Sequence, residues 1–156
     1  MRLHRRGSGP KIRVLTGHME WILTPADTGG QYCMLEAFVP PGGGVPPHQH
    51  LDHEAFSIIE GSVEVARMDE SGLHWIPTSA GDAINVPSDE IHGFRNTSNA
   101  PARLLVTGSA RLGAFFEEAG VPLAVDAAPS PPTTQDVQRV LAIAQKYGHR
   151  FLPREH

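Results

Sequence analysis

The sequence predicts an all-β protein, either a sandwich or a small barrel, followed by C-terminal helices. Its 156 residues are enough for one domain with a hydrophobic core. The 16 glycines and 14 prolines indicate many turns, and therefore many short strands. Apolar and β-branched runs recur between these turns at a spacing that favours a sandwich or barrel over alternating βαβ units. Helical periodicity begins only after Ser109.

The basic start of the chain, residues 1–11 (MRLHRRGSGPK), contains no apolar run of signal-peptide length. We predict a flexible, solvated tail there. The net charge of −4 argues against a general nucleic-acid binder, because phosphate contacts need a surface rich in lysine and arginine. The sequence also lacks an apolar run near the roughly 20 residues that a membrane span needs. Neither nucleic acid nor membrane is therefore expected as a partner.

Cys33 is the only cysteine, so no disulfide can form within the chain. Nothing in the sequence indicates an oxidising compartment, and a cytoplasmic location is expected. Cys33 lies in the strand-like run QYCMLEAFV. A buried structural thiol is the expected role, because free cysteine behaves mostly as a small apolar residue.

The segments before the histidine-rich region have the composition of strands. Residues 12–26 and 31–39 hold apolar, β-branched and aromatic residues on either side of a predicted loop at 27–30. They would form the outer sheet of a barrel. Residues 40–47 (PPGGGVPP) are predicted to form a loop, since proline lacks the ladder donor and glycine weakens a strand.

Short strands separated by turns continue up to Ser109. Closing them into a small barrel would remove free edges and create an interior that holds one small ligand. The predicted strands are 55–59, 62–68, 74–77, 83–86, 93–96 and 102–108. Together with the early strands they define a predicted barrel domain over residues 12–110.

The pattern after Ser109 predicts a helical extension, residues 111–156. A short helix is expected over ARLGAFFEEA, ending at Gly120, and then a proline- and alanine-rich linker. Thr133 and Asp136 have capping-box spacing at the start of a second helix, and Gly148 is a typical C-terminal stop. The apolar stripe of this helix is predicted to pack on the outside of the barrel. The alternative is that it caps the pocket or contacts a partner's barrel.

His48, His50 and Glu54 are separated by even numbers of residues, as required for side chains on one face of a strand. If the segment is extended, they share the inward face with Phe56 and Ile58. Imidazole and carboxylate bind divalent first-row metals, and His92 is the candidate fourth ligand from a distant segment. We therefore predict one metal site made of these three histidines and Glu54. His53 has odd parity and is predicted to point outward.

With these residues in view, the chain resembles a cupin. The first motif of that superfamily is matched at every position and at its spacing, by Gly42, His48, His50, Glu54 and Gly61. The second motif is matched by Gly81, Pro87, His92 and Asn96. Asp89 stands where the family usually has glycine at a turn with positive φ, and aspartate is one of the few other residues that tolerate that conformation.

The C-terminal part resembles the ending of small quercetinase-like cupins. Gly113 to Glu118 and Lys146 to Pro153 carry the resemblance. It implies a small cupin β-barrel, which is a double-stranded β-helix or jelly roll, with C-terminal helices. It also implies a homodimer, with the first strands and the final helix as contacts.

Three imidazoles and one carboxylate leave coordination positions open, which is a property of catalytic rather than structural metal sites. Iron, manganese, nickel, copper and zinc all accept this donor set. The resemblance implies a metal-dependent dioxygenase, with dioxygen and an aromatic or enolic small molecule as substrates. Two alternatives stay open: a non-redox cyclase or isomerase that uses the metal as a Lewis acid, and a binding module without catalysis.

Glu54 is the predicted catalytic residue as well as a predicted ligand. As a ligand it would lower the charge of the metal, and if released it could take a proton from a bound hydroxyl or carbon acid. Other inward positions are apolar, which suits an aromatic or enolic molecule better than a sugar phosphate. The candidates for the barrel lining are Phe56, Ile58, Phe94, Met34, Tyr32 and Trp75.

Overall fold

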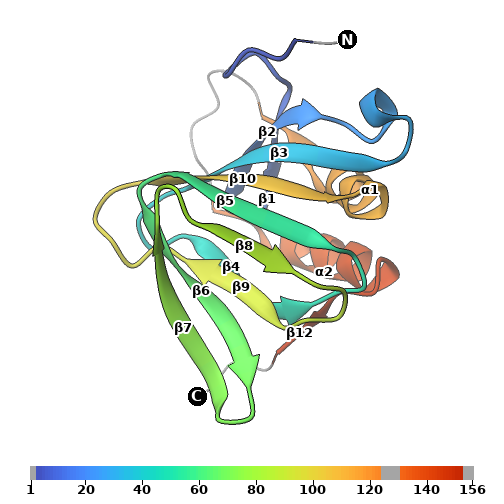
Figure 1. The fold of residues 1–156 in the computed structure, drawn as a ribbon. Coiled ribbons are helices and arrows are strands. Elements are labelled where there is room, and N and C mark those ends of the chain that lie inside the picture. Colours follow the sequence, from blue (N-terminus) through green and yellow to red (C-terminus); the bar gives the residue numbers. More distant parts are fainter. Residues whose placement is uncertain (1–2, 124–130, 153–156) are drawn as a thin grey trace.

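A computed structural model of the chain describes residues 3–123 and 131–152. Two antiparallel sheets face each other, and two helices lie together at one side of them (Figure 1). The seven-stranded sheet has the order β11 (Val121–Pro122), β1 (Lys11–Val14), β2 (Gly17–Leu23), β3 (Tyr32–Val39), β10 (Ala102–Ser109), β5 (Glu54–Glu60) and β8 (Ala83–Val86). The five-stranded sheet has the order β12 (Arg150–Phe151), β4 (Gly44–Gln49), β9 (His92–Arg95), β6 (Ser62–Asp69) and β7 (Gly72–Ser79). This is the double-stranded β-helix that the resemblance implies.

The barrel interior is filled by side chains that alternate along the strands. On β10, Ala102, Leu104 and Val106 are buried while the residues between them are more exposed. Phe56 and Ile58 on β5 do the same. This period of two is what a half-buried strand produces, and it directs the buried residues of both sheets into one core. Among the described residues, the cluster between the sheets contains Ala37, Val39, Phe56, Ile58, Val63, Val65, Val86, Phe94, Ala102, Leu104 and Val106.

Two parts of the sequence-based outline are wrong. The first predicted strand is two strands, β1 and β2, which turn at Leu15 with a φ of 54°. Residues 40–47 were expected to be a loop, yet β4 begins at Gly44 and runs through two prolines. The ladder with β9 tolerates these prolines because its register shifts between Val45 and His48, so a bulge replaces the bonds that proline cannot make.

The predicted lining of the barrel is also only partly correct. Phe56, Ile58 and Phe94 lie in the core as expected. Tyr32 is 41% exposed, and Trp75 lies under the guanidinium of Arg95 at 4.0 Å. Both aromatic residues therefore belong to outer surfaces of the sheets, where an amphipathic ring can be partly exposed to water.

Both helices begin and end close to where the sequence predicts. α1 (Ala110–Ala119) begins after Ser109, whose hydroxyl accepts from the Leu112 amide, and ends before Gly120. α2 (Thr134–Lys146) has the expected capping box of Thr133 and Asp136. α1 contacts β3 and β10, and it packs on α2 through a cluster of Leu112, Phe115, Ala119 and Ala144. Residues 124–130 of the expected linker lie outside the described residues.

Within the described parts of the chain, none of the helices has the length and apolar character needed to cross a membrane.

Tight turns account for several motif positions. Asp89 has a φ of 65°, which confirms the expectation that it replaces a glycine in a left-handed turn. Gly61 has a φ of 75°, and a Cβ built there would lie 2.6 Å from the carbonyl oxygen of Pro101. Asn96 is a structural residue, because its side-chain amide donates to the carbonyls of Val39 and Ala100.

We expect Gly61→Ala to destabilise the fold more than Gly29→Ala. Both glycines adopt a left-handed conformation, which costs about 1–2 kcal/mol for an alanine. Only at Gly61 would the new Cβ also collide with backbone, since nothing lies within 4 Å of the position at Gly29. Urea unfolding should show a clearly lower midpoint for Gly61→Ala. Equal midpoints for the two variants would contradict the close approach of Gly61 to the backbone at the start of β10.

Candidate metal centre

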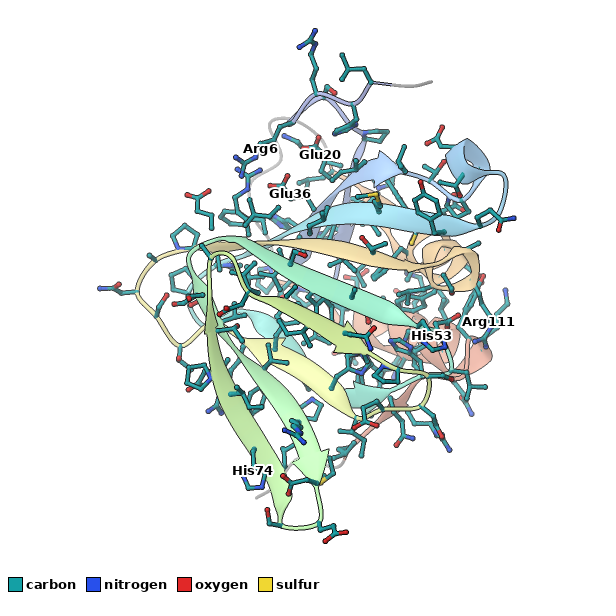
Figure 2. All side chains as sticks on the ribbon, in the orientation of Figure 1. Arg6, Glu20, Glu36, His53, His74 and Arg111 are labelled. Carbon is teal, nitrogen blue, oxygen red and sulfur yellow. The ribbon has the colours of Figure 1, made fainter. Side chains whose placement is uncertain are left out.

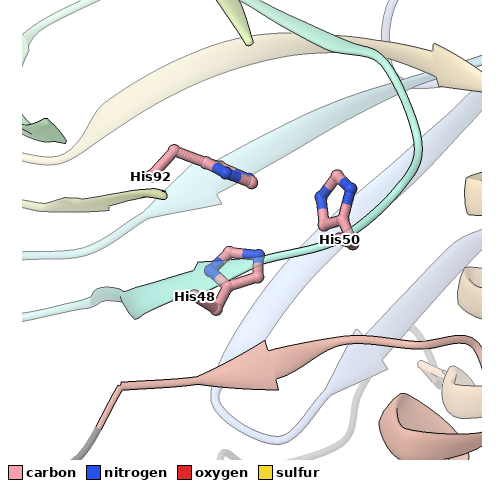
Figure 3. Close-up of side chains that lie close together, drawn as sticks. All are labelled: His48, His50 and His92. Carbon is pink, nitrogen blue, oxygen red and sulfur yellow. The ribbon is translucent and has the colours of Figure 1, made fainter. Parts of the chain in front are cut away.

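Three buried histidines meet between the two sheets. His48 comes from β4, His50 from the turn after it, and His92 from the start of β9 (Figure 3). One ring nitrogen of each lies within 4.8 Å of the others, and the residues are only 8%, 1% and 2% exposed. The ring centroids of His48 and His92 are 4.3 Å apart. Such a cluster of imidazoles could hold a metal ion.

The premise of one extended strand from His48 to Glu54 is wrong, although the three histidines do meet and Glu54 lies beside two of them. β4 belongs to the five-stranded sheet and ends at Gln49, whereas Glu54 opens β5 of the seven-stranded sheet. The chain therefore crosses from one sheet to the other between these strands. His50 and Glu54 still meet because the inner faces of both sheets point into the same interior. His53 is exposed, as its parity predicted (Figure 2).

A backbone carbonyl fixes the tautomer of each imidazole. Nδ1 of His48 lies 3.0 Å from the carbonyl oxygen of Pro46, Nδ1 of His50 lies 3.1 Å from that of Asp52, and Nδ1 of His92 lies 2.8 Å from that of Glu90. A carbonyl only accepts, so each Nδ1 carries the hydrogen and donates it. In the neutral ring, Nε2 is then left with a lone pair, the arrangement found in metal-ligating histidines.

Glu54 lies beside two of these imidazoles. Its Oε2 lies 3.1 Å from Nε2 of both His50 and His92. Because Nδ1 already carries a hydrogen, Nε2 can donate to this oxygen only in a doubly protonated ring. Two neutral imidazoles and an ionised carboxylate would instead bring lone pairs together. A divalent cation removes that repulsion, so the residues present fit a metal ion.

Burial sets the charge state of the cluster. It is the main cause that lowers the pKa of His48 to about 3, and His92 lowers it further. Burial alone would raise the pKa of Glu54, but hydrogen bonds from the His50 and His92 rings, when these are protonated at Nε2, outweigh it and lower that pKa to about 2. A cation held by the neutral rings would keep the carboxylate ionised in the same way. At neutral pH, His48 is therefore neutral and Glu54 is ionised, which are the forms that bind a metal.

Asp52 ties the turn between the sheets to the helices. It is buried, accepts a hydrogen bond from the Ser109 hydroxyl at 2.6 Å, and forms an ion pair with Arg111 at 3.1 Å. Arg111 also donates to the Tyr147 carbonyl at the end of α2, at 2.6 Å. Since the Asp52 carbonyl accepts from Nδ1 of His50, this network positions a histidine of the cluster.

His149 is the residue that the sequence-based prediction missed. It follows the helix stop at Gly148, and its ring centroid lies 4.7 Å from that of His50. Burial is the main cause that lowers its pKa to about 4. A histidine directly after the helix stop at Gly148 was a usable signal in the sequence. The contact of His149 with His50 could not be predicted from the sequence, because the pairing of β12 with β4 is not encoded locally.

We expect the metal-free protein to lose stability on mild acidification. In the unfolded chain His48 and His149 titrate near their ordinary pKa of about 6.5, far above their folded values. Between these values the unfolded chain binds more protons than the folded one. The free energy of unfolding therefore decreases as the pH is lowered, by up to about 1.4 kcal/mol per pH unit for each histidine. Urea unfolding after chelation, between about pH 7 and pH 5, measures this slope. A flat profile would contradict the burial of neutral imidazoles.

The fold and the histidine cluster define a double-stranded β-helix protein with a buried candidate metal site. Residues 35–108 match the family described as a cupin domain, Cupin_2. The part of the chain that forms most of the barrel therefore matches the cupin superfamily. It is also 26% identical over 137 residues to quercetin 2,3-dioxygenase from Bacillus subtilis (strain 168), covering 86% of this chain. The matched region is 40% of that protein's length.

Solved structures show the same fold. The polyketide cyclase RemF from Streptomyces resistomycificus has a TM-score of 0.58 and 20% identity, covering 92% of this chain and 97% of RemF. A predicted oxalate decarboxylase from Thermotoga maritima has a TM-score of 0.60 and 21% identity, covering 70% of this chain and 98% of that one. At these identities the similarity supports the fold and leaves the reaction to be argued from the site.

Proposed function

We propose that the chain is a metal-dependent dioxygenase that acts on an aromatic or enolic small molecule. Its metal would be held by Nε2 of His48, His50 and His92 together with the Glu54 carboxylate. The observation that carries the proposal is the convergence of the His50 and His92 Nε2 atoms on one oxygen of Glu54. The similarity to a quercetin dioxygenase supports this choice of reaction among the chemistries that cupins host.

Each residue of the proposed centre has a distinct task. A bound transition metal would supply a Lewis acid and, if redox-active, electron transfer to dioxygen. The three imidazoles, fixed by their carbonyl acceptors, would set its position. Glu54, ionised at neutral pH, would accept the proton of the substrate's enol or phenol hydroxyl. The apolar rings of Phe56 and Phe94, 5.7 Å apart, exclude water from this side of the site.

Oxygen uptake tests the proposal. Protein purified without a polyhistidine tag would first be analysed for its metal content. The loaded protein would then be given quercetin, or an enolisable 1,3-diketone, in an oxygen-electrode cell. We expect oxygen consumption that requires both the metal and the organic substrate. A product that forms equally well without oxygen would contradict the dioxygenase and leave the metal centre in place.

A non-redox cyclase or isomerase is the second candidate. The observation in its favour is the fold similarity to the polyketide cyclase RemF, which extends over nearly the whole of both chains. Such an enzyme needs only a Lewis acid beside a general base. Zinc, which has no redox chemistry, would then support full turnover. Full turnover with zinc under anaerobic conditions would favour this candidate over the dioxygenase.

A further inference from the structure

His149 is a fourth imidazole packed against the histidine cluster. It lies where the chain leaves α2 and enters β12, and its residue is only 8% exposed. Its ring centroid is 4.7 Å from that of His50 and 6.0 Å from that of His48. On another side the ring of Phe115 lies at 4.3 Å. A residue far along the sequence from both metal-site segments therefore contributes to the wall of the centre.

The Nε2 atom of His149 has no hydrogen-bond partner. Among the described residues it is the one buried side-chain nitrogen or oxygen in this condition. A buried polar atom without a partner costs about 1–3 kcal/mol, and native structures contain few of them. The cost disappears when a molecule that enters the site offers an acceptor. An unsatisfied imidazole nitrogen at the edge of a metal centre, which carries a hydrogen in one of the two neutral tautomers, is therefore suited to donate to a ligand.

His149 is better placed to contact a ligand than to bind the metal. The nitrogens that lie within 4.8 Å of one another belong to His48, His50 and His92, and those of His149 are outside this group. It is also fixed in place. Its amide donates to the Ala144 carbonyl at 2.9 Å, and the next residues pair with β4 so that Phe151 lies opposite His48.

We propose that His149 is a substrate-contacting residue of this centre, whose Nε2–H donates a hydrogen bond to an anionic oxygen of the bound small molecule. The proposal rests on the proposed metal site, because a divalent cation is what would draw an enolate or carboxylate oxygen to this place. The neighbouring ring of Phe115 is apolar, so His149 provides a polar contact that fixes the orientation of the ligand.

Azide binding to the cobalt(II)-loaded protein tests this role, with the visible spectrum of the metal as the readout. His149→Phe keeps a ring between His50 and Phe115 but removes Nε2, and His149→Gln restores an N–H donor of similar reach. We expect azide to bind about tenfold more weakly to His149→Phe, as for the loss of one charge-assisted hydrogen bond, and to recover in part with His149→Gln. The affinity for cobalt should stay within about twofold, because the ligand set is untouched.

Phe151→Leu is the matched control. It tests whether weaker packing of the C-terminal strand, without the loss of a hydrogen-bond donor, is enough to reduce azide affinity. Phe151 comes from the same short strand and stacks on His48 at 5.4 Å, but it has no polar side-chain atom. Its azide affinity should equal that of the wild type, and a loss like that of His149→Phe would overturn the proposal.

Three other results would also decide against it. Wild-type azide affinity in His149→Phe would remove the role of His149 and leave the metal centre standing. A large loss of cobalt affinity in both His149 variants would make His149 a ligand or a packing residue. If the wild-type protein binds no cobalt, the proposed metal function itself fails.

Discussion

Replacing His92 with alanine is expected to abolish stoichiometric metal binding. His92 is the one member of the histidine cluster that comes from β9, so it joins the two sequence segments of the site. Even the outer partners of metal ligands are worth about 10–100-fold in affinity, and loss of a ligand should exceed about 100-fold. The variant also leaves Glu54 with one imidazole partner instead of two. Metal content after dialysis, measured by elemental analysis, gives the result directly.

His53→Ala is the matched control for this experiment. It removes an imidazole beside Glu54 in the sequence, but one that is exposed. The metal content of His53→Ala should equal that of the wild type. A thermal melt of both variants after chelation separates metal loss from unfolding, since a folded His92→Ala should no longer gain stability when metal is added. Wild-type metal content in a folded His92→Ala would refute the proposed ligand set.

The orientation of each histidine ring follows from local chain geometry, whereas the grouping with His92 depended on the matched cupin motifs. Each Nδ1 donates to a carbonyl two residues away, so the HxH pattern and the residues beside His92 already hold the elements that orient the rings. Asp89 is a similar case, since its positive φ follows from the turn in which it lies. The capping box at Thr133 is formed within four residues. Local chemistry of this kind is readable without a structure.

Features that depend on pairing between strands distant in the sequence could not be predicted from the sequence. β4 runs through Pro46 and Pro47 because β9 and β12 supply partners on its two sides, and no property of the segment itself announces them. His149 joins the site for the same reason. Its place is set by β12, a strand of two residues that has almost no sequence signal of its own. Tertiary context therefore overrides local preference where these segments meet.

Glu54→Gln is expected to separate metal binding from catalysis. Three imidazoles remain, and three protein ligands are enough to hold a metal in many catalytic sites. The amide cannot accept a proton at neutral pH, and loss of a general base costs about 10²–10⁴-fold in rate. We therefore expect oxygen uptake with quercetin to fall by at least about 100-fold, while the protein still takes up metal. If Glu54→Gln consumes oxygen at the wild-type rate, Glu54 is not the general base.

The same substitution should have the opposite effect on the metal-free protein. In the wild type, Oε2 of Glu54 faces two Nε2 atoms, each 3.1 Å away, and neither carries a hydrogen in the neutral ring. A glutamine N–H₂ group can donate to both nitrogens. It thereby replaces a repulsive contact with hydrogen bonds worth about 1 kcal/mol. After chelation, Glu54→Gln should therefore unfold at a higher urea concentration than the wild type. A lower midpoint would mean that the imidazoles are already protonated at Nε2, and that hydrogen bonds rather than a cation join Glu54 to them.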